Sequence, residues 1–359
     1  MGVFYLIMMT DSIIKQLKIP KFDKAAAARA RLRQDTLTKP PGSLGRLESL
    51  SIQLSGIYGS SNISTANKTV IVMAADHGVT EEGVSAFPGS VTRQMVLNFL
   101  RGGAAINVLA RQAGAKVVVV DMGVAADFDR SYGLLDQKIA HGTQNMAKGP
   151  AMTRAQAEQG IQTGIRIMES EFAAGLDLVA LGEMGIGNST AASAITAVIT
   201  GHPVSEVTGR GTGLDDKSLQ HKIDIIQKAI ETNHPDPIDA LDVLIKLGGF
   251  EIAGLAGVAL AAASHRIPVV LDGFISSSAA LLAFKLDPAV KHYLLASHLS
   301  VEKGHRAILE YIGLEPLLNL DLRLGEGTGA VLVFNLIEAA GRILNEMSTF
   351  EEAGVDNKE

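Results

Sequence analysis

Short, continuously apolar segments alternate along this chain with longer, alanine-rich segments. The apolar runs are Thr69–Ala74, Lys116–Asp121, Leu176–Leu181, Pro268–Leu271 and Tyr293–Ala296. Because polar and apolar residues do not alternate within them, they indicate strands that are buried on both faces, as in a parallel sheet. The segments between them are long enough to be crossover helices. The sequence therefore predicts a doubly wound, mostly parallel α/β fold.

The two ends of the chain are predicted to be helical. Asp23–Arg33 and Ser43–Ser60 read as polar helical segments, separated by Pro40-Pro41-Gly42, which breaks helices. Ala330–Met347 has the pattern of an amphipathic helix, and Thr349–Glu359 is expected to be a loose polar tail. Neither end contributes a predicted strand.

The composition excludes several classes of protein. The net charge is −6 and no Lys/Arg cluster stands out, so we expect no nucleic-acid partner. There is no cysteine, which excludes disulfides and thiolate metal sites and fits a reducing compartment. The opening Met1–Met8 is apolar but lacks the positive region and cleavage site of a signal peptide, and it carries no motif. We therefore expect a cytoplasmic protein with no membrane partner.

Two glycine-rich segments are candidates for binding a phosphate. In open α/β sheets ligands bind beyond the carboxyl ends of the strands, and Gly185–Thr190 follows one of those ends and opens into a helical segment. Its glycines would let backbone N–H groups approach an anion. The second segment, Gly209–Asp216, leads into a helix carrying Lys217 and Lys222, of which Lys222 is better placed. On their own, such turns are as often purely structural.

The segment Leu324–Gly329 holds a carboxylate, Glu326, between two glycines directly before an apolar helix. One interpretation is a capping turn, with Thr328 as the N-cap and Glu326 as an acid near the helix dipole. The other is a base that faces a cleft, because the flanking glycines leave space around the carboxylate. The local sequence favours the base.

Other polar residues have structural interpretations. His77 lacks a second histidine at helical spacing, so we predict no metal site. Asp121 and Asp272 are expected to cap loops or to order the helices that follow them. Ser276-Ser277-Ser278 lacks the setting of a nucleophile elbow and is expected to start a helix. Ser90 is expected to be the N-cap of another.

These motifs occur in a specific order along residues 37–354. They are Leu37–Glu48, Ala75–Val79, Pro88–Val96, Gly182–Thr190, Gly209–Gly213, Leu271–Phe274, Ser297–Ser300 and Leu322–Ala330. Together they resemble the nicotinate-nucleotide:dimethylbenzimidazole phosphoribosyltransferase family of cobalamin nucleotide-loop assembly.

The resemblance implies transfer of the phosphoribosyl group of nicotinate mononucleotide to 5,6-dimethylbenzimidazole, which gives α-ribazole 5′-phosphate and nicotinate without a cofactor. It also implies a large Rossmann-like domain, which we place at residues 61–325, and a small helical domain built from both chain ends, residues 1–60 together with 326–359. The family resemblance further implies a homodimer.

The resemblance also assigns roles to individual residues. Glu326 matches the general base, and Glu183 matches a second acid in the cleft. Pro88 and Gln94 fall in the segment of the benzimidazole pocket. The remaining substrate-binding assignments, mostly in segments of the nucleotide phosphate site, are Gly185, Gly187, Asn188, Gly211, Lys222 and Ser300.

These residues suit the implied chemistry. The pyridinium of nicotinate mononucleotide leaves as a neutral ring, so the reaction needs a base and alignment of two rings rather than a metal. Burial of Glu326 would raise its pKa toward the working pH. We hypothesise a single displacement with inversion.

Two alternative functions stay open from the sequence. One is phosphorolysis or hydrolysis of a nucleotide glycosidic bond, with phosphate or water as the acceptor. The other is a non-catalytic nucleotide-binding regulator, since a fold does not dictate an activity. A glutamate held in a glycine turn argues against the regulator. Dimethylbenzimidazole, adenine and a phenol are all flat enough to be the acceptor.

Overall fold

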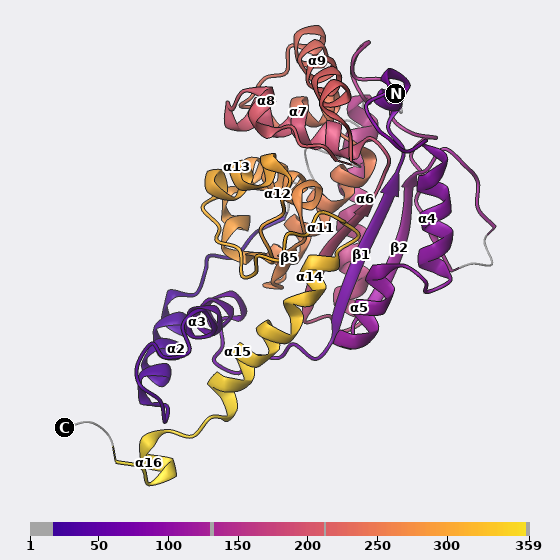
Figure 1. The fold of residues 1–359 in the computed structure, drawn as a ribbon. Helices are drawn as coiled ribbons and strands as arrows, with labels where there is room; N and C mark the ends of the chain where they lie inside the picture. The colour runs from indigo at the N-terminus through magenta and orange to yellow at the C-terminus, as the bar shows by residue number, and fades with distance from the viewer. Residues whose placement is uncertain (1–16, 130–132, 212, 357–359) are drawn as a thin grey trace.

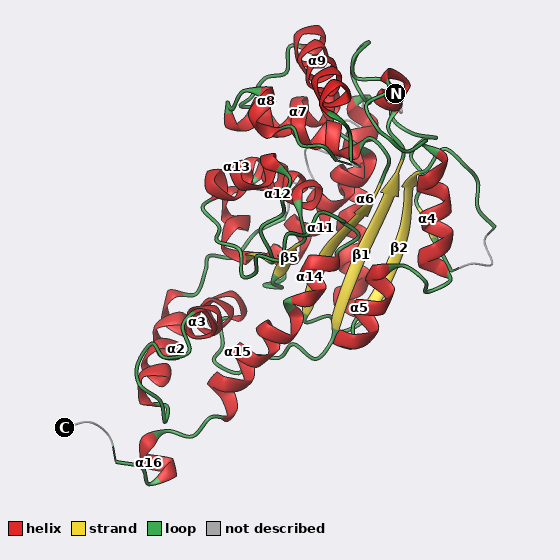
Figure 2. Cartoon of the chain, viewed as in Figure 1, coloured by secondary structure: helices red, strands yellow, loops and turns green. Residues whose placement is uncertain are grey.

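A single parallel sheet forms the centre of the molecule. The computed structural model describes residues 17–129, 133–211 and 213–356. The strands are β1 (Lys68–Ala75), β2 (Lys116–Gly123), β3 (Leu135–Asp136), β4 (Leu178–Met184), β5 (Val269–Leu271) and β6 (Leu294–Ala296). Their order is β3-β2-β1-β4-β5-β6 and each described pair is parallel, so the doubly wound α/β prediction is confirmed (Figure 2). The sequence reading missed β3, whose two residues are exposed.

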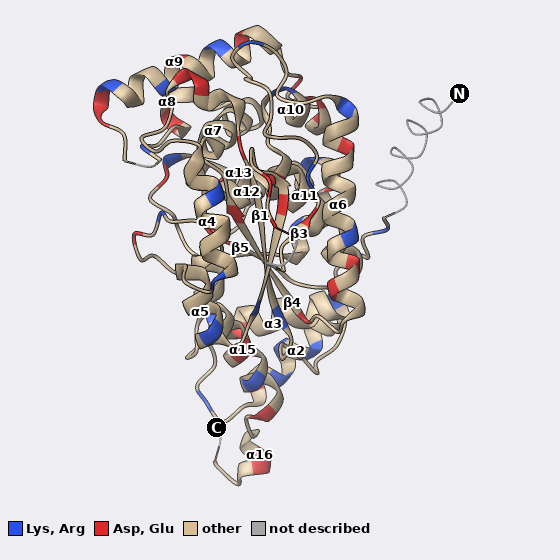
Figure 3. Ribbon diagram, turned by 90° about the vertical axis from the view of Figure 1, so that its right-hand side faces the viewer, with Lys and Arg blue, Asp and Glu red and all other residues tan. Residues whose placement is uncertain are grey.

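Helices cover both faces of the sheet. Along β1, Ile71 and Met73 pack into one apolar cluster, whereas Val70 and Val72 pack into another. The first face is covered by α6 (Arg154–Ala173), α7 (Asn188–Thr200), α10 (Ala240–Leu247), α11 (Phe250–Ser264) and α12 (Phe274–Leu286). The second is covered by α3 (Arg46–Tyr58), α4 (Ser90–Leu100), α5 (Ala105–Ala113), α14 (Thr328–Leu332) and α15 (Phe334–Glu346). Figure 3 shows α4 and α5 on the opposite side of the strands from α6 and α11.

The structure also describes helices outside these two sets. They are α2 (Lys24–Thr36), α8 (Val204–Val207), α9 (Asp216–Asn233), α13 (Lys303–Ile312) and α16 (Phe350–Ala353), with short 3-10 helices at Gly78–Glu82 and Pro288–Tyr293. Within the described part of the chain, no helix combines the length and the apolar character needed to cross a bilayer.

Helices from the first sixty residues pack against the last long helix of the chain. Figure 1 shows α2 and α3 beside α15 and α16, although they are far apart in the sequence. Leu37 forms an isolated bridge with Thr349, and the Arg33 Nε donates to the carbonyl of Leu344 at 2.7 Å. The division into domains at residues 60 and 325 stays a prediction.

Three local expectations were wrong. Ser90 is the first residue of α4 rather than its N-cap, which is Gly89. The segment Ala330–Met347 is not one helix, because α14 ends before α15 begins. The tail contains α16, which Thr349 caps by accepting a hydrogen bond from the Glu352 N–H. A short polar helix like α16 has no apolar periodicity for a sequence reading to detect.

Candidate active site

The Glu326 turn lies in a left-handed conformation at the carboxyl end of the sheet. Glu326 has φ +65°, between Gly325 at +88° and Gly327 at +93°. Left-handed backbone costs a non-glycine residue roughly 1 kcal/mol and often marks a functional site. Gly182 of β4 leaves space for the turn, because a Cβ there would lie 3.0 Å from the Glu326 carbonyl carbon.

The Glu326 carboxylate does not cap the helix that follows it. Its Oε2 accepts a hydrogen bond from the N–H of Ile106, in the first turn of α5, at 3.2 Å. The N-cap of α14 is Gly327, and the Thr328 hydroxyl donates to the Gly325 carbonyl. Only 5% of Glu326 is exposed, and burial raises the pKa of its carboxyl despite the Ile106 N–H. These contacts argue against the capping-turn interpretation.

Asp272, directly after β5, holds this turn in place. Its carboxylate accepts hydrogen bonds from the N–H groups of Gly327 at 3.0 Å, Gly329 at 2.7 Å and Ala330 at 3.2 Å. Burial raises the pKa of Asp272 to about 7, although these three donors favour the charged form. Asp272 thus orders α14, far along the chain, rather than the α12 helix that directly follows it.

Asp121, by contrast, orders its own loop. It accepts from the N–H groups of Gly123 at 3.0 Å and Val124 at 2.8 Å, and it pairs with Lys138 at 2.7 Å. The structural interpretation of Asp121 is therefore confirmed.

Glu183 lies near the end of β4, beside the Glu326 turn. It is buried, and its Oε2 accepts a hydrogen bond from the Asn188 side-chain amide. Its Oε1 lies so close to Gly325 that a side chain there would collide with it. Burial, reinforced by the negative charges of Asp272 and Glu251, raises the pKa of Glu183 to about 8. The fold thus brings together the two predicted catalytic acids, with Asn188 beside them.

A buried ion pair supports the Gly185–Gly187 segment. The Nε2 of His77 lies 2.6 Å from Oε1 of Glu251 in α11. Burial disfavours the imidazolium, but the Glu251 carboxylate outweighs burial and raises the pKa of His77. A Cβ on Gly185 would lie 3.4 Å from both side chains, and Gly187 is the left-handed N-cap of α7 over His77. Both glycines therefore have packing roles.

The second glycine segment lies over a buried lysine. Lys222 of α9 is 1% exposed, and its Nζ donates to the Ser189 hydroxyl at 2.9 Å. A Cβ on Gly211, which has φ +51°, would lie 3.2 Å from that Nζ. Burial lowers the pKa of Lys222 to about 8. Lys217, by contrast, is exposed, so Lys222 is the lysine beside the glycine loop.

A cavity of about 400 Å³ opens beside this loop. Its lining includes three cationic side chains, those of Arg210, Lys303 and Arg323, and one buried carboxylate, that of Glu302. Arg323 also donates to the carbonyl of Gly211 at 3.3 Å, and Ser300 donates to the neighbouring Leu322 carbonyl at 3.1 Å. Ser300, Gly211 and Lys222 therefore belong to one cation-rich region.

The residues predicted to bind the benzimidazole lie at α4, which contacts the glycine segment. Pro88 and Gln94 are exposed, before and within α4. Thr92 of the same helix accepts a hydrogen bond from the Ile186 N–H at 3.1 Å, which ties α4 to the Gly185–Gly187 segment. No described contact joins Pro88 or Gln94 to Glu326, so their role stays a prediction.

Sequence reasoning missed three residues with a part in this site. Asp272 was assigned to a local role, while Glu251 and Arg323 were not considered. Glu251 has a sequence signal, because it is the only charged residue in the helix Phe250–Ser264. Across the residues that the structure describes, no group of three or more His, Asp or Glu side chains is arranged to hold a metal ion.

Comparisons with known proteins identify the family. A family model described as "Phosphoribosyltransferase" matches residues 19–355. A nicotinate-nucleotide–dimethylbenzimidazole phosphoribosyltransferase of Roseiflexus castenholzii is 56% identical over 351 residues, covering 98% of this chain and 99% of that protein. The enzyme of the same name from Chloroflexus aggregans is 58% identical over 340 residues, covering 95% of this chain and 96% of the other.

Solved structures match as well. The crystal structure of a nicotinate-nucleotide–dimethylbenzimidazole phosphoribosyltransferase from Thermus thermophilus superposes with a TM-score of 0.89 and 47% identity. The match covers 94% of this chain and 100% of that one. Sequence and fold agree over nearly the whole length, and the chain belongs to the nicotinate-nucleotide–dimethylbenzimidazole phosphoribosyltransferase family.

Proposed function

We propose that this enzyme transfers the phosphoribosyl group of nicotinate mononucleotide to 5,6-dimethylbenzimidazole, in cobalamin biosynthesis. The observation that carries the proposal is the buried Glu326 carboxylate, held in a left-handed turn beside Glu183. The names of close relatives supply the substrates. The geometry supplies a base at one end of the site and cations at the other.

Glu326 is the general base of this proposal. Its buried carboxylate has a raised pKa, which makes it a stronger base than an exposed glutamate. Glu183, with a pKa of about 8, is mainly protonated at neutral pH. Neighbouring carboxyl groups in different environments have different pKa values and take different roles. In this proposal the ionised Glu326 accepts the proton and Glu183 remains neutral.

The phosphate of the nucleotide binds at the cation-rich region. Lys222 and Arg323 both lie beside Gly211 and would neutralise the charge of the phosphate. Bound phosphate would also favour the charged form of Lys222. Asn188, which donates to Glu183 and precedes Ser189, connects this region to the acids, with Gly185 and Gly187 directly before it in the chain. Ser300 donates to the carbonyl of Leu322, next to Arg323.

The reaction is a single displacement. Glu326 removes the imidazole proton of the benzimidazole, whose nitrogen forms a bond to C1′ of the ribose. The C1′–N bond to the pyridinium breaks on the opposite face, and its electron pair stays on the nicotinate ring. The configuration at C1′ changes from β to α. A ribosylated enzyme trapped during turnover would contradict this route.

The test is nicotinate release from nicotinate mononucleotide, with and without dimethylbenzimidazole. We expect release to depend on the benzimidazole and to fall about 10²-fold or more in Glu326→Gln, since the amide cannot accept the proton. Glu346→Gln, an exposed acid on α15, is the matched control. Release that requires phosphate or water instead would identify a phosphorylase or hydrolase. Full activity of Glu326→Gln would move the base to Glu183.

We also propose the finer assignments that come from the resemblance and the composition. The family resemblance supports a homodimer, with Pro88 and Gln94 in the benzimidazole pocket. The absence of cysteine supports a reducing, cytoplasmic location. The packing of α2 and α3 against α15 supports a small helical domain built from both chain ends.

A further inference from the structure

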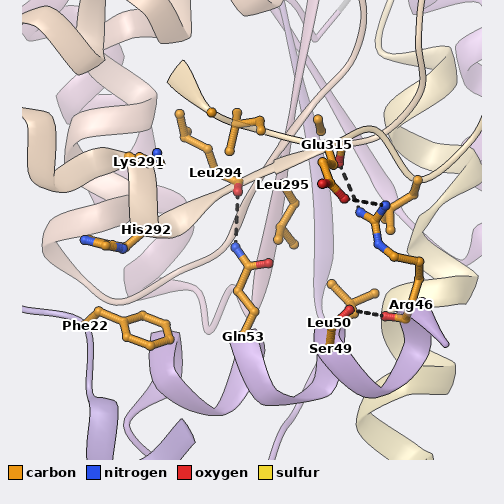
Figure 4. A pocket seen from close by; sticks show the side chains of 14 residues that line it. Phe22, Arg46, Ser49, Leu50, Gln53, Lys291, His292, Leu294, Leu295 and Glu315 are labelled. Carbon is orange, nitrogen blue, oxygen red and sulfur yellow. Dashed lines mark hydrogen bonds and ion pairs between the residues drawn. The ribbon is translucent and has the colours of Figure 1, made fainter. Parts of the chain in front are cut away.

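A second cavity lies at the open edge of the sheet. Its volume is about 360 Å³, and it is lined by α3, by β6 with the residues before it, and by the turn after α13 (Figure 4). Among the strands that the structure describes, β6 is the last in the sheet and pairs with β5 alone, and all three of its residues line this cavity. None of the residues proposed above for catalysis or substrate binding lines it.

The apolar part of the cavity lining suits a flat apolar group. Leu50 of α3 lines the cavity from one side and Leu294 and Leu295 of β6 line it from another, and all three are almost fully buried. Phe22 and His292 form a wall of two rings, with centroids 5.5 Å apart. Aromatic side chains bind flat rings through stacking and burial of apolar area.

The polar rim carries unbalanced positive charge. Arg46 is paired with Glu315 at 3.1 Å, whereas Lys291 has no carboxylate within 4.0 Å among the residues that the structure describes. Gly313 leaves room for this ammonium group, because a Cβ there would lie 2.7 Å from its Nζ. Burial, together with the charges of Lys291 and Lys24, lowers the pKa of His292, which is therefore neutral at pH 7. The rim thus offers one unpaired cation.

We propose that this cavity binds a small aromatic monocarboxylate, with its ring against Phe22 and its carboxylate on Lys291. A single unpaired ammonium matches one negative charge, whereas a phosphate would need a second cation and Arg46 is already paired. A volume of about 360 Å³ is at the lower end of the range for small-molecule pockets and accommodates one ring.

Nicotinate, the product of the proposed reaction, belongs to this chemical class. The assignment of nicotinate as the natural occupant rests on the proposed function, whereas the assignment of the class rests on the cavity alone. Benzoate is therefore the first probe, because its binding can be measured whether or not the enzyme releases nicotinate.

The experiment measures benzoate binding to the full chain by ligand-observed NMR and calorimetry, followed by displacement with nicotinate. We expect millimolar affinity that falls about tenfold in Lys291→Gln, the loss of one hydrogen bond to a charged group. Ser49→Phe should abolish binding, because Ser49 lines the cavity from α3 and the ring would fill it. Lys228→Gln, a lysine change on α9, is the control and should bind like the wild type.

The results separate the alternatives. Equal binding by the wild type, Lys291→Gln and Ser49→Phe would place benzoate elsewhere and overturn the proposal, as would no binding to a folded wild type. Thermal melting of each variant shows that it is folded. Benzoate binding in this cavity without nicotinate release would leave the site standing while the proposed function fails.

Discussion

The two ends of the candidate active site differ in charge but share one physical feature. At the acid end, burial raises the pKa values of Glu183, Asp272 and Glu326. At the cation end, burial lowers the pKa of Lys222 to about 8. Burial therefore favours the neutral form of both kinds of group, which suits a carboxylate that accepts a proton during the reaction and a lysine that gains an anionic partner when the nucleotide binds.

The ends also differ in what holds them. The acid end is fixed by backbone N–H groups from distant segments, since Asp272 of one loop binds the Glu326 turn and Ile106 binds Glu326 itself. The cation end is fixed by side chains beneath a glycine loop, with Lys222 on Ser189. Changes that displace groups at the acid end should therefore lower kcat, whereas changes at the cation end should weaken nucleotide binding.

The largest effect on activity, and the strongest test of this difference between the two ends, is expected from Asp272→Asn. The amide still accepts from Gly329 and Ala330, but its NH₂ group faces the Gly327 N–H, so one bond becomes a repulsion. Displacing the Glu326 turn by a fraction of an ångström to one ångström should lower kcat by about 10²-fold. Steady-state kinetics should show little change in KM for the nucleotide.

Asp121→Asn is the matched control for Asp272→Asn, because Asp121, near the end of β2, also accepts from two backbone N–H groups but has no described hydrogen bond to a candidate catalytic residue. It should lose stability without the loss in kcat. Equal losses of kcat in the two variants would mean that Asp272 acts only through the fold.

The next largest effect is expected at the cation end, from Lys222→Met. Methionine fills most of the buried volume but removes the charge that would meet the phosphate. We expect KM for nicotinate mononucleotide to rise about tenfold or more, since charge-assisted hydrogen bonds contribute roughly 1.5–3 kcal/mol, with a smaller change in kcat. Lys217→Met, on the exposed side of α9, should leave both constants unchanged. A loss confined to kcat would sink the division between the two ends.

Sequence patterns predicted much of this arrangement. Five of the six strands and the glycine turns at their ends could be predicted, because apolar runs, glycines and strand-end polar residues are local signals. The same locality explains why β3 was missed and why Ser90 was taken for an N-cap when Gly89 is. A two-residue strand has no periodicity, and serine caps helices often enough to mislead.

Long-range partners could not be predicted. Asp272 meets residues 55 to 58 positions later in the chain, and His77 meets Glu251 across 174 positions. The sequence around each residue fits a local role as well as a long-range one, since an aspartate after a strand commonly orders the adjacent loop. Only the order of strands, which places β1, β4 and β5 side by side, brings these groups to one place.

The smallest expected effect concerns the protonation of Glu183 at the acid end and is measured as the pH dependence of thermal stability. The pKa of Glu183 is about 8 in the folded protein against 4.5 for an ordinary glutamate, so its protonated form favours folding. This stabilisation is complete below the ordinary pKa and is lost as the pH rises toward and through 8. Glu183→Gln keeps a neutral side chain at every pH and should not show that loss.

The measurement is the melting temperature of Glu183→Gln and the wild type from about pH 5 to pH 9. The difference should grow in favour of the variant by about 2 to 4 °C across this range, whereas the exposed control Glu346→Gln should follow the wild type. If the difference instead stays constant, Glu183 does not titrate in this window. It would then be ionised at neutral pH and would compete with Glu326 for the role of base, so Glu326→Gln would retain more activity than a single base allows.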